Sequence, residues 1–357
     1  MESVVINRAF WSGKRVFLTG HTGFKGSWLS LWLTVMGAEV HGYALTAPTE
    51  PNFFSVTEIK KQLTTSTIAD IRNDSALKRA MQDARPEIVI HLAAQSLVRH
   101  SYVEPAETFA ANVMGTVNLF EAVRRTASVK AVVNITSDKC YENREWVWPY
   151  RENEPLGGYD PYSSSKACSE LVTRAWRCSF LDTLGIQVAS ARAGNVIGGG
   201  DWATDRLVPD FLRALDAGRP LLVRSPLATR PWQHVFDPLS GYLVLAERLY
   251  KEGAVCAEAW NFGPDESDCR SVQWIAEALC ARVPGAAWMF ESGQHSHETL
   301  TLKLDSSKAR ARLGWQPRWN LQRGLDAAID WHQAWKSGAD MTSFSLKQLS
   351  DYVETAR

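Results

Sequence analysis

Tyr162 and Lys166 have the side-chain types and the spacing of a proton-transfer pair. A separation of four residues puts both side chains on the same face of a helix. A free phenol has a pKa of about 10 and is a weak base at neutral pH, but a nearby ammonium favours the phenolate and lowers that pKa. The pair can therefore take a proton from a hydroxyl group or return one. Because the same spacing also fits a surface Tyr and Lys on an amphipathic helix, the interpretation depends on the neighbouring elements.

A second polar cluster follows the apolar segment Lys130–Ile135, which has the pattern of a strand in a parallel sheet. Ser137, Asp138 and Lys139 bring a hydroxyl, a carboxylate and an amine to the carboxyl end of that strand. Open α/β sheets bind their ligands at this edge. A polar turn is the alternative explanation. We favour a catalytic site, because Lys166 adds a second amine to the hydroxyl, the acid and the first amine.

The elements that must position these groups begin with a glycine-rich turn. Lys14–Thr19 is predicted to be a buried strand and Ser27–Met36 a helix, and Gly20, Gly23 and Gly26 lie between them with the spacing G-x-x-G-x-x-G. Glycines permit a tight turn and let backbone N–H groups approach a pyrophosphate at a helix N-terminus. The usual fingerprint is G-x-G-x-x-G, so this turn is a variant. Its place between a strand and a helix favours phosphate binding over a purely structural turn.

The predicted second strand, Glu39–Ala44, leaves NAD and NADP open. NAD sites usually carry Asp or Glu at the end of this strand, and NADP sites use a nearby arginine. Here the residues directly after the strand are neutral, and the first arginine that follows is Arg72. Asp70, at the end of a predicted third strand, has two interpretations of equal weight: it accepts a hydrogen bond from an adenine amino group, or it caps the next helix.

Composition excludes several classes of protein. The 357 residues predict roughly two domains, and the 45% apolar content suffices for a core. Lys plus Arg and Asp plus Glu both number 39, which argues against a nucleic-acid partner. The longest apolar run near the N-terminus, Trp28–Met36, is too short to cross a membrane, and Met1–Asn7 lacks a signal-peptide pattern. Six cysteines without a Cys-x-x-Cys pair favour free thiols and a cytoplasmic location.

Four stretches together resemble the extended short-chain dehydrogenases/reductases, and among them the nucleotide-sugar 4,6-dehydratases, most of all the CDP-glucose group. They are Gly20–Trp28, Thr136–Tyr141, Arg192–Trp202 and Arg230–His234. The resemblance implies an α/β fold: a Rossmann-type doubly wound parallel sheet with a smaller C-terminal α/β substrate-binding domain. It places an NAD-binding domain at residues 1–193 and a nucleotide-sugar-binding domain at 194–357. The chain is expected to return to the first domain around residues 232–260, after a long flexible loop at 194–201.

The resemblance also implies a reaction, that of a lyase. CDP-D-glucose would be dehydrated to CDP-4-keto-6-deoxy-D-glucose by an internal hydride shuttle through tightly bound NAD. Carbon 4 is oxidised, water is lost across carbons 5 and 6, and carbon 6 is reduced. The product would feed deoxysugar and lipopolysaccharide biosynthesis. Family members pair through helices that correspond to those bearing Asn112 and Lys166, which implies a homodimer with no membrane partner.

Roles for the polar groups follow from the same resemblance. Tyr162 would take the proton of the 4-hydroxyl, Lys166 would hold the ribose and lower the pKa of the tyrosine, and Ser137 would bond to the 4-oxygen. Asp138 would protonate the departing 6-hydroxyl, for which its pKa must rise well above about 3.9. Lys139 stands where dTDP-glucose dehydratases have a glutamate base, and would remove the carbon-5 proton as a neutral amine. The alternative is that Lys139 only binds substrate.

Binding residues are implied in the same way. Those assigned to the cofactor are Gly20, Gly23, Phe24, Lys25, Gly26, Asp70, Ile71, Leu92, Ala93, Ala94, Asn112, Tyr162 and Lys166. Those assigned to the substrate are Gln95, Ser96, Asn195, Arg206, Arg230, His234 and His297. Guanidinium groups suit the two phosphates of a sugar nucleotide. The segment His295–Glu298 invites a metal interpretation, but nothing near it completes a zinc site, so no metal is predicted.

Two other functions compete with dehydration. A sugar-nucleotide 4-epimerase of the same superfamily would need neither an acid for a 6-hydroxyl nor a base at carbon 5, so Asp138 and Lys139 argue against it. An idle dinucleotide-binding scaffold would not require the intact set of Tyr162, Lys166 and Ser137. The sequence contains no Gly-x-Ser-x-Gly elbow that would support a hydrolase.

Overall fold

A seven-stranded parallel sheet forms the larger part of the molecule. The computed structural model describes residues 6–293 and 299–355. The strand order is β10-β6-β5-β4-β1-β2-β3, and every pair in it is parallel. The order reverses between β1 and β4, as in doubly wound folds. The predicted doubly wound parallel sheet is confirmed. Its strands are β1 (Arg15–Thr19), β2 (Glu39–Ala44), β3 (Thr65–Ile68), β4 (Ile88–His91), β5 (Ala131–Ile135), β6 (Gln187–Ala193) and β10 (Ala259–Phe262).

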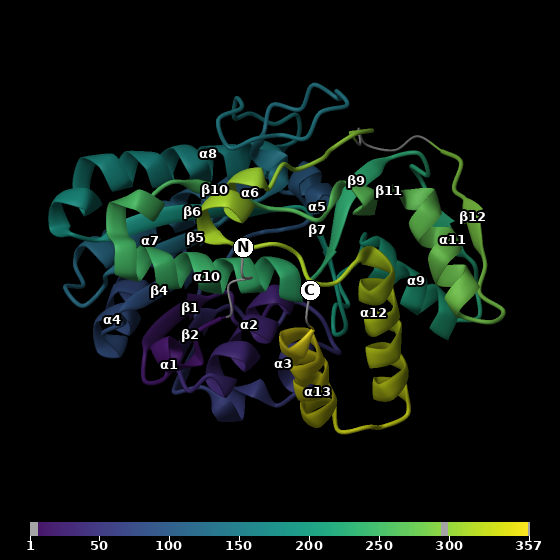
Figure 1. The fold of residues 1–357 in the computed structure, drawn as a ribbon, viewed down its shortest axis with the longest axis horizontal. Helices are drawn as coiled ribbons and strands as arrows, with labels where there is room; N and C mark the ends of the chain where they lie inside the picture. The colour runs from purple at the N-terminus through teal and green to yellow at the C-terminus, as the bar shows by residue number, and fades with distance from the viewer. Residues whose placement is uncertain (1–5, 294–298, 356–357) are drawn as a thin grey trace.

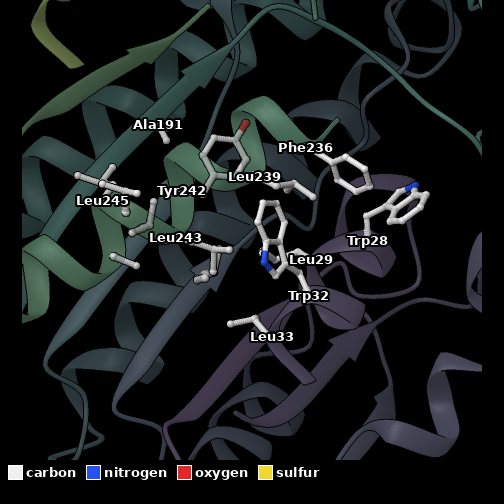
Figure 2. Close-up of a cluster of buried hydrophobic side chains, with 14 of the residues drawn as sticks. Trp28, Leu29, Trp32, Leu33, Ala191, Phe236, Leu239, Tyr242, Leu243 and Leu245 are labelled. Carbon is white, nitrogen blue, oxygen red and sulfur yellow. The ribbon is translucent and has the colours of Figure 1, made fainter. Parts of the chain in front are cut away.

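Helices cover both faces of this sheet because its central strands are apolar on both sides. Along β1, Val16 and Leu18 join one buried cluster and Phe17 joins the other, as the alternation of a strand requires. The first cluster packs against α2 (Phe24–Val35) and α10 (Phe236–Glu252), and Figure 2 shows its aromatic and leucine side chains. The second packs against α4 (Asp74–Ala84) and α7 (Gly115–Arg124). This covering holds the carboxyl ends of the strands in fixed positions.

The C-terminal part adds two small sheets and several helices, which lie to one side of the large sheet in Figure 1. Its elements are β7 (Asn195–Ile197), α9 (Leu207–Asp216), β8 (Leu221–Val223), β9 (Thr229–His234), β11 (Cys269–Ser271), α11 (Val272–Arg282), β12 (Trp288–Phe290), α12 (Leu321–Lys336) and α13 (Met341–Glu354). The remaining α-helices are α1 (Arg8–Trp11), α3 (Phe53–Val56), α5 (Val98–Val103), α6 (Pro105–Phe109) and α8 (Pro161–Trp176).

The connection after β6 corrects one expectation. Residues 194–201 were expected to form a long loop, but β7 lies within them, because Asn195–Ile197 pairs in parallel with Trp232–His234 of β9. Strand β10 lies beside β6 at the edge of the large sheet, so the chain does return to that sheet, at residues 259–262. The division into two domains at residue 194 stays a prediction.

The glycine-rich turn between β1 and α2 is tighter than the sequence predicted. Helix α2 begins at Phe24, so Gly26 lies within its first turn and not before it. A Cβ atom on Gly26 would lie 2.0 Å from the carbonyl oxygen of Gly20. Gly20 has a φ of +75°, and a Cβ there would lie 2.8 Å from the backbone nitrogen of Ala93, at the end of β4. Only glycine fits at these two positions.

Replacement of Gly26 by alanine tests this close packing. We expect Gly26→Ala to destabilise the fold by about 2 kcal/mol or more, because the added methyl group overlaps backbone that cannot move aside. Gly23→Ala is the matched control in the same turn, since its Cβ would lie 3.4 Å from the nearest atom. Thermal unfolding without cofactor measures both, and an equal loss in the two variants would contradict the packing described.

Candidate active site

The carboxyl ends of β4, β5 and β6 meet the first turns of α8 at one edge of the sheet. Helix α8 begins with Asp160 as its N-cap, whose Oδ1 accepts from the backbone N–H of Ser163 at 2.9 Å, and with Pro161 in its first turn. This start places Tyr162 in the first turn and Lys166 one turn later. Both side chains are buried, at 8% and 6% exposure. The predicted pair therefore lies on one helix in the interior of the site.

Burial dominates the electrostatics of this pair. It raises the pKa of Tyr162 to about 12, against a lowering by a hydrogen bond with Ser137. It lowers the pKa of Lys166 to about 8, against the raising effect of Glu170. Lys166 Nζ donates to the carbonyl of Ile135 at 3.2 Å. The expectation that the tyrosine pKa is lowered is wrong for this structure, because loss of water around the phenol outweighs the neighbouring charges.

Ser137 and Asp138 lie directly after β5, at the start of the short 3-10 helix η3 (Asp138–Cys140). Ser137 Oγ accepts from the N–H of Lys139 at 3.2 Å and donates to Asp138 Oδ1 at 3.0 Å. Asp138 is 2% exposed, and its Oδ2 has no hydrogen-bond partner within residues 6–293 and 299–355. Burial raises the pKa of Asp138, while the charges of Lys139 and Arg230 lower it. The protonated carboxyl that a general acid requires is therefore favoured.

A cavity opens from this edge towards the C-terminal part of the chain. Among the predicted site residues, Ser96, Lys139, Asn195, Arg206 and Arg230 line it. Arg206 donates to Asp201 at 2.8 Å and to Ser96 at 3.2 Å, and so joins a segment after β4 to a segment after β7. Basic side chains and an amide that converge on one cavity suit a diphosphate.

Two further arginines in the cavity were not predicted as site residues. Arg99 of α5 and Arg224 after β8 both bond to Asp205, at 2.8 and 3.1 Å. Asp205 has a φ of +59° and lies on the segment between β7 and α9. The contact joins residues 106 and 19 positions apart, which no local pattern reveals.

The other three substrate assignments have separate outcomes: that of His234 is corrected, and those of Gln95 and His297 stay predictions. His234 is 1% exposed and packs against the rings of Phe236 and Trp319, so its assignment to the substrate is wrong. The side chain of Gln95 bonds to Leu97 and Thr108 and shapes the loop after β4. His297 lies outside the described residues.

The predicted cofactor residues follow the carboxyl edge from β1 to β4. The glycine turn, Phe24 and Lys25 lie at the start of α2, and Leu92, Ala93 and Ala94 follow β4. Burial and the charges of Lys166 and Arg206 lower the pKa of Lys25 to about 7, while Asp138 raises it. Lys25 therefore lies close enough to Lys166, Arg206 and Asp138 for their charges to change its pKa. The sequence did not indicate this proximity.

Asn112, assigned to the cofactor, has a structural role in this fold. Asn112 lies in a π-helical segment, η2 (Ala110–Met114), between α6 and α7. Its side chain bonds to both backbone groups of Gln95 and to Ser165, so it joins the loop after β4 to α8. A cofactor contact by Asn112 stays a prediction.

The carboxylate of Asp70 is held by Arg72, through the backbone N–H at 2.8 Å and through the guanidinium. The helix-capping alternative for Asp70 is wrong, because Asn73 caps α4. Ile71 is buried against Gly115, where an added Cβ would lie 2.7 Å from it. Its place beside adenine stays a prediction.

The residues present fit a dinucleotide. A Cβ on Gly20 would fill the space in which the turn approaches the residues after β4, and a Cβ on Gly26 would overlap the backbone of the turn itself. The turn leads into the N-terminus of α2, a helix of 12 residues. Such a terminus suits a pyrophosphate. In the described part of the chain no group of His, Cys, Asp and Glu side chains is placed to hold a metal ion. None of the described helices is long and apolar enough to cross a membrane.

Comparison with known proteins places this fold and site in a family. The family model described as GDP-mannose 4,6 dehydratase matches residues 17–328. The chain therefore belongs to the nucleotide-sugar dehydratases of that family. A CDP-glucose 4,6-dehydratase from Salmonella typhimurium (strain LT2) is 54% identical over 355 residues, covering 98% of this chain and 99% of the relative. Within the family, the chain belongs with the CDP-glucose 4,6-dehydratases.

More distant matches agree on the fold. A dTDP-glucose 4,6-dehydratase from Xanthomonas campestris pv. campestris (strain B100) is 26% identical over 309 residues, 80% of this chain and 84% of that protein. The structure of a Bacillus anthracis dTDP-glucose 4,6-dehydratase in complex with NAD superposes with a TM-score of 0.75 at 20% identity, over 92% of this chain and 99% of that one. A UDP-glucose 4-epimerase from Stenotrophomonas maltophila gives 0.78 at 21% identity, over 91% and 100%. At these identities the superpositions show the fold alone.

The raised pKa of Asp138 predicts how stability depends on pH. An aspartate whose pKa is higher in the folded than in the unfolded chain leaves stability unchanged below the unfolded value of about 3.9. Above that pH it lowers stability progressively, until the pH exceeds the pKa of the aspartate in the folded chain. We therefore expect Asp138→Asn to unfold at a higher temperature than the wild type, by a margin that grows with pH above about 4 and then levels off. A margin independent of pH would contradict the assignment, and Asp351→Asn, an exposed aspartate on α13, is the control.

Proposed function

We propose that this protein dehydrates CDP-D-glucose to CDP-4-keto-6-deoxy-D-glucose with NAD as an internal hydride carrier. One observation carries the proposal: a buried Asp138 with a raised pKa and a cavity-lining Lys139 directly follow Ser137 at the end of one strand. Loss of water needs an acid and a base at adjacent carbons, whereas exchange at carbon 4 needs neither. The 54% identical CDP-glucose 4,6-dehydratase supports both the reaction and the nucleobase.

The first step concerns the 4-hydroxyl of the sugar. NAD, when bound, would supply the hydride acceptor and a positive charge that favours the phenolate of Tyr162. The glycine turn would hold its pyrophosphate, and Lys166 would bond to its ribose. Ser137 would hold the 4-oxygen, so that Tyr162 receives the proton at a fixed place. Because the pKa of Tyr162 lies at about 12 in this structure, the surrounding positive charges are needed for that step.

Elimination then uses the two residues that follow Ser137. A keto group at carbon 4 acidifies the proton on carbon 5, which Lys139 would remove as a neutral amine. Asp138, held by Ser137 and shielded from water, would give its proton to the 6-hydroxyl as that group leaves as water. Arg206 and Arg230 would hold the diphosphate, and Asn195 would contact it from β7. As carbon 6 is then reduced, carbon 5 must gain a proton, which Lys139, protonated in the elimination, would return.

Product analysis in deuterium oxide tests the function, with CDP-glucose and dTDP-glucose as separate substrates. Dehydration of CDP-glucose alone, with one deuterium gained at carbon 5, is the result expected. Interconversion at carbon 4 without loss of water would replace the proposal by an epimerase. No change in either substrate would favour another sugar nucleotide or the idle scaffold.

The substitution Lys139→Ala distinguishes two roles for Lys139, removal of the carbon-5 proton and binding of substrate alone. If Lys139 removes the carbon-5 proton, its loss lowers turnover, and with it the rate at which carbon 5 gains deuterium, by about 10²- to 10⁴-fold, while KM changes little. A rise in KM with unchanged kcat would show instead that Lys139 only binds substrate. Lys347→Ala, an exposed lysine on α13, is the control.

We further propose a homodimer built on α6, η2, α7 and α8, which pack against one another. Large apolar side chains are exposed along these helices and the segment after them, among them Met114 at 52% and Leu171 at 54%. Phe109 and Phe180 are also exposed, at 36% and 43%. Apolar groups of this size on neighbouring helices support pairing with a second copy. Cytoplasmic location and a place in lipopolysaccharide biosynthesis stay predictions.

A charge within this surface should separate the subunits. We expect Leu171→Glu to raise the dissociation constant of the dimer at least tenfold, roughly, because the carboxylate would be desolvated in the interface. Val255→Glu is the matched control, since Val255 is 63% exposed and lies far along the chain, in the 3-10 segment 253–256. Light scattering over a dilution series measures the mass. A wild-type monomer, or equal effects of the two substitutions, would refute this interface.

A further inference from the structure

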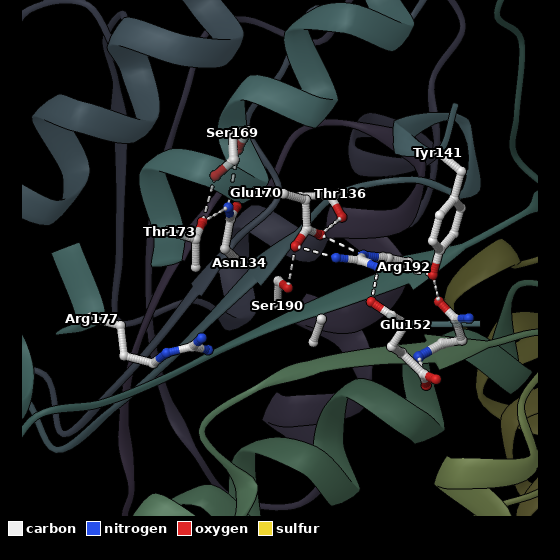
Figure 3. A network of polar contacts seen from close by, with 12 residues as sticks. Asn134, Thr136, Tyr141, Glu152, Ser169, Glu170, Thr173, Arg177, Ser190 and Arg192 are labelled. Carbon is white, nitrogen blue, oxygen red and sulfur yellow. Dashed lines mark hydrogen bonds and ion pairs between the residues drawn. The ribbon is translucent and has the colours of Figure 1, made fainter. Parts of the chain in front are cut away.

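A buried ion pair lies beneath the catalytic edge of the sheet. Glu170 of α8 and Arg192 of β6 have side chains only 4% and 3% exposed. Arg192 donates through Nε to Oε1 at 3.0 Å and through Nη2 to Oε2 at 2.8 Å. Thr136 donates to Oε1 at 2.5 Å and Ser190 to Oε2 at 2.7 Å. Each carboxylate oxygen therefore accepts two hydrogen bonds, and Figure 3 shows how these side chains converge on Glu170.

The three elements that meet at Glu170 are the three that carry the site. Glu170 follows Lys166 by four residues on α8, so the two side chains share one face of the helix. Thr136 directly precedes Ser137 and Asp138. Ser190 and Arg192 lie on β6, shortly before Asn195. One carboxylate therefore sets the spacing between the predicted proton-transfer pair, the predicted acid and the substrate side of the edge.

The guanidinium extends the same network to the far end of the 3-10 helix η3. Arg192 Nη1 donates to Tyr141 Oη at 2.8 Å and to the carbonyl of Glu152 at 3.2 Å. Tyr141 in turn donates to Asn261 of β10 at 2.7 Å, and the guanidinium lies 4.9 Å from the centre of the Tyr141 ring. The segment from Ser137 to Tyr141, which carries Asp138 and Lys139, is thus held at both ends by one ion pair.

We propose that Glu170 and Arg192 are positioning residues for the reaction, which fix the distance between Lys166 and the Ser137–Lys139 segment. This inference rests on the proposed function. The negative charge of Glu170 raises the pKa of Lys166, against the burial that lowers it to about 8. In the described part of the chain, titratable groups that interact electrostatically with Lys166 also include Cys140 from η3, His91 from β4 and Lys25 from α2. Glu170 is the acidic group among them.

A purely structural role would make a different prediction. Replacing both members of a buried ion pair by apolar residues of similar size is often neutral or stabilising, whereas removing one leaves an uncompensated charge. The double variant Glu170→Leu/Arg192→Met should therefore fold, even if the single variant Glu170→Gln does not. Because it lacks both the charge and the fork of hydrogen bonds, it separates stability from positioning.

The experiment compares wild type, Glu170→Gln and the double variant, with Glu247→Gln of the exposed Glu247–Lys251 pair on α10 as control. We expect kcat to fall about 10²-fold with little change in KM, since a small misplacement of reacting groups has an effect of that size. The pKa of Lys166, from competitive labelling of its amine across pH, should fall by about one unit. The alkaline limb of kcat should move by the same amount.

A folded double variant with wild-type kcat and an unchanged Lys166 pKa would overturn the proposal. The labelling needs no substrate, so it decides the question even if the wild type does not dehydrate CDP-glucose, which would count against the proposed function alone.

Discussion

Arg192 carries a full positive charge beneath the carboxyl edge of the large sheet, where almost no water reaches it. A buried guanidinium is strongly unfavourable unless a carboxylate and further acceptors surround it. Glu170 satisfies that requirement, and it does so from the same helix that bears Tyr162 and Lys166. The position of α8 across β5 and β6 is therefore tied to the pairing of one buried charge, and the geometry of the site follows from it.

Burial also favours the neutral form of three titrating groups of the site. The pKa of Asp138 is raised, that of Lys166 is lowered to about 8 and that of Tyr162 is raised to about 12. In each case loss of water favours the neutral form. The protonated Asp138 that an acid requires is thereby favoured, whereas the Tyr162 phenolate depends on positive charge supplied by its neighbours.

Local patterns in the sequence predicted most of the sheet, the glycine turn and the groups at its carboxyl edge, because each depends on residues close together along the chain. His234 was misassigned because Trp319, 85 positions later in the chain, packs against its ring. The ion pairs Arg99–Asp205 and Glu170–Arg192 were not predicted, for the same reason. Contacts between distant segments follow from tertiary packing, which no spacing rule encodes.

The central claim is that one site oxidises carbon 4, eliminates water and reduces carbon 6 without releasing the hydride. It is tested most directly by mixing CDP-glucose deuterated at carbon 4 with an equal amount of substrate that carries carbon-13 throughout its sugar. The account predicts deuterium at carbon 6 of the product, and only in molecules without carbon-13. Deuterium in carbon-13 molecules, its loss to solvent, or its retention at carbon 4 would contradict the account.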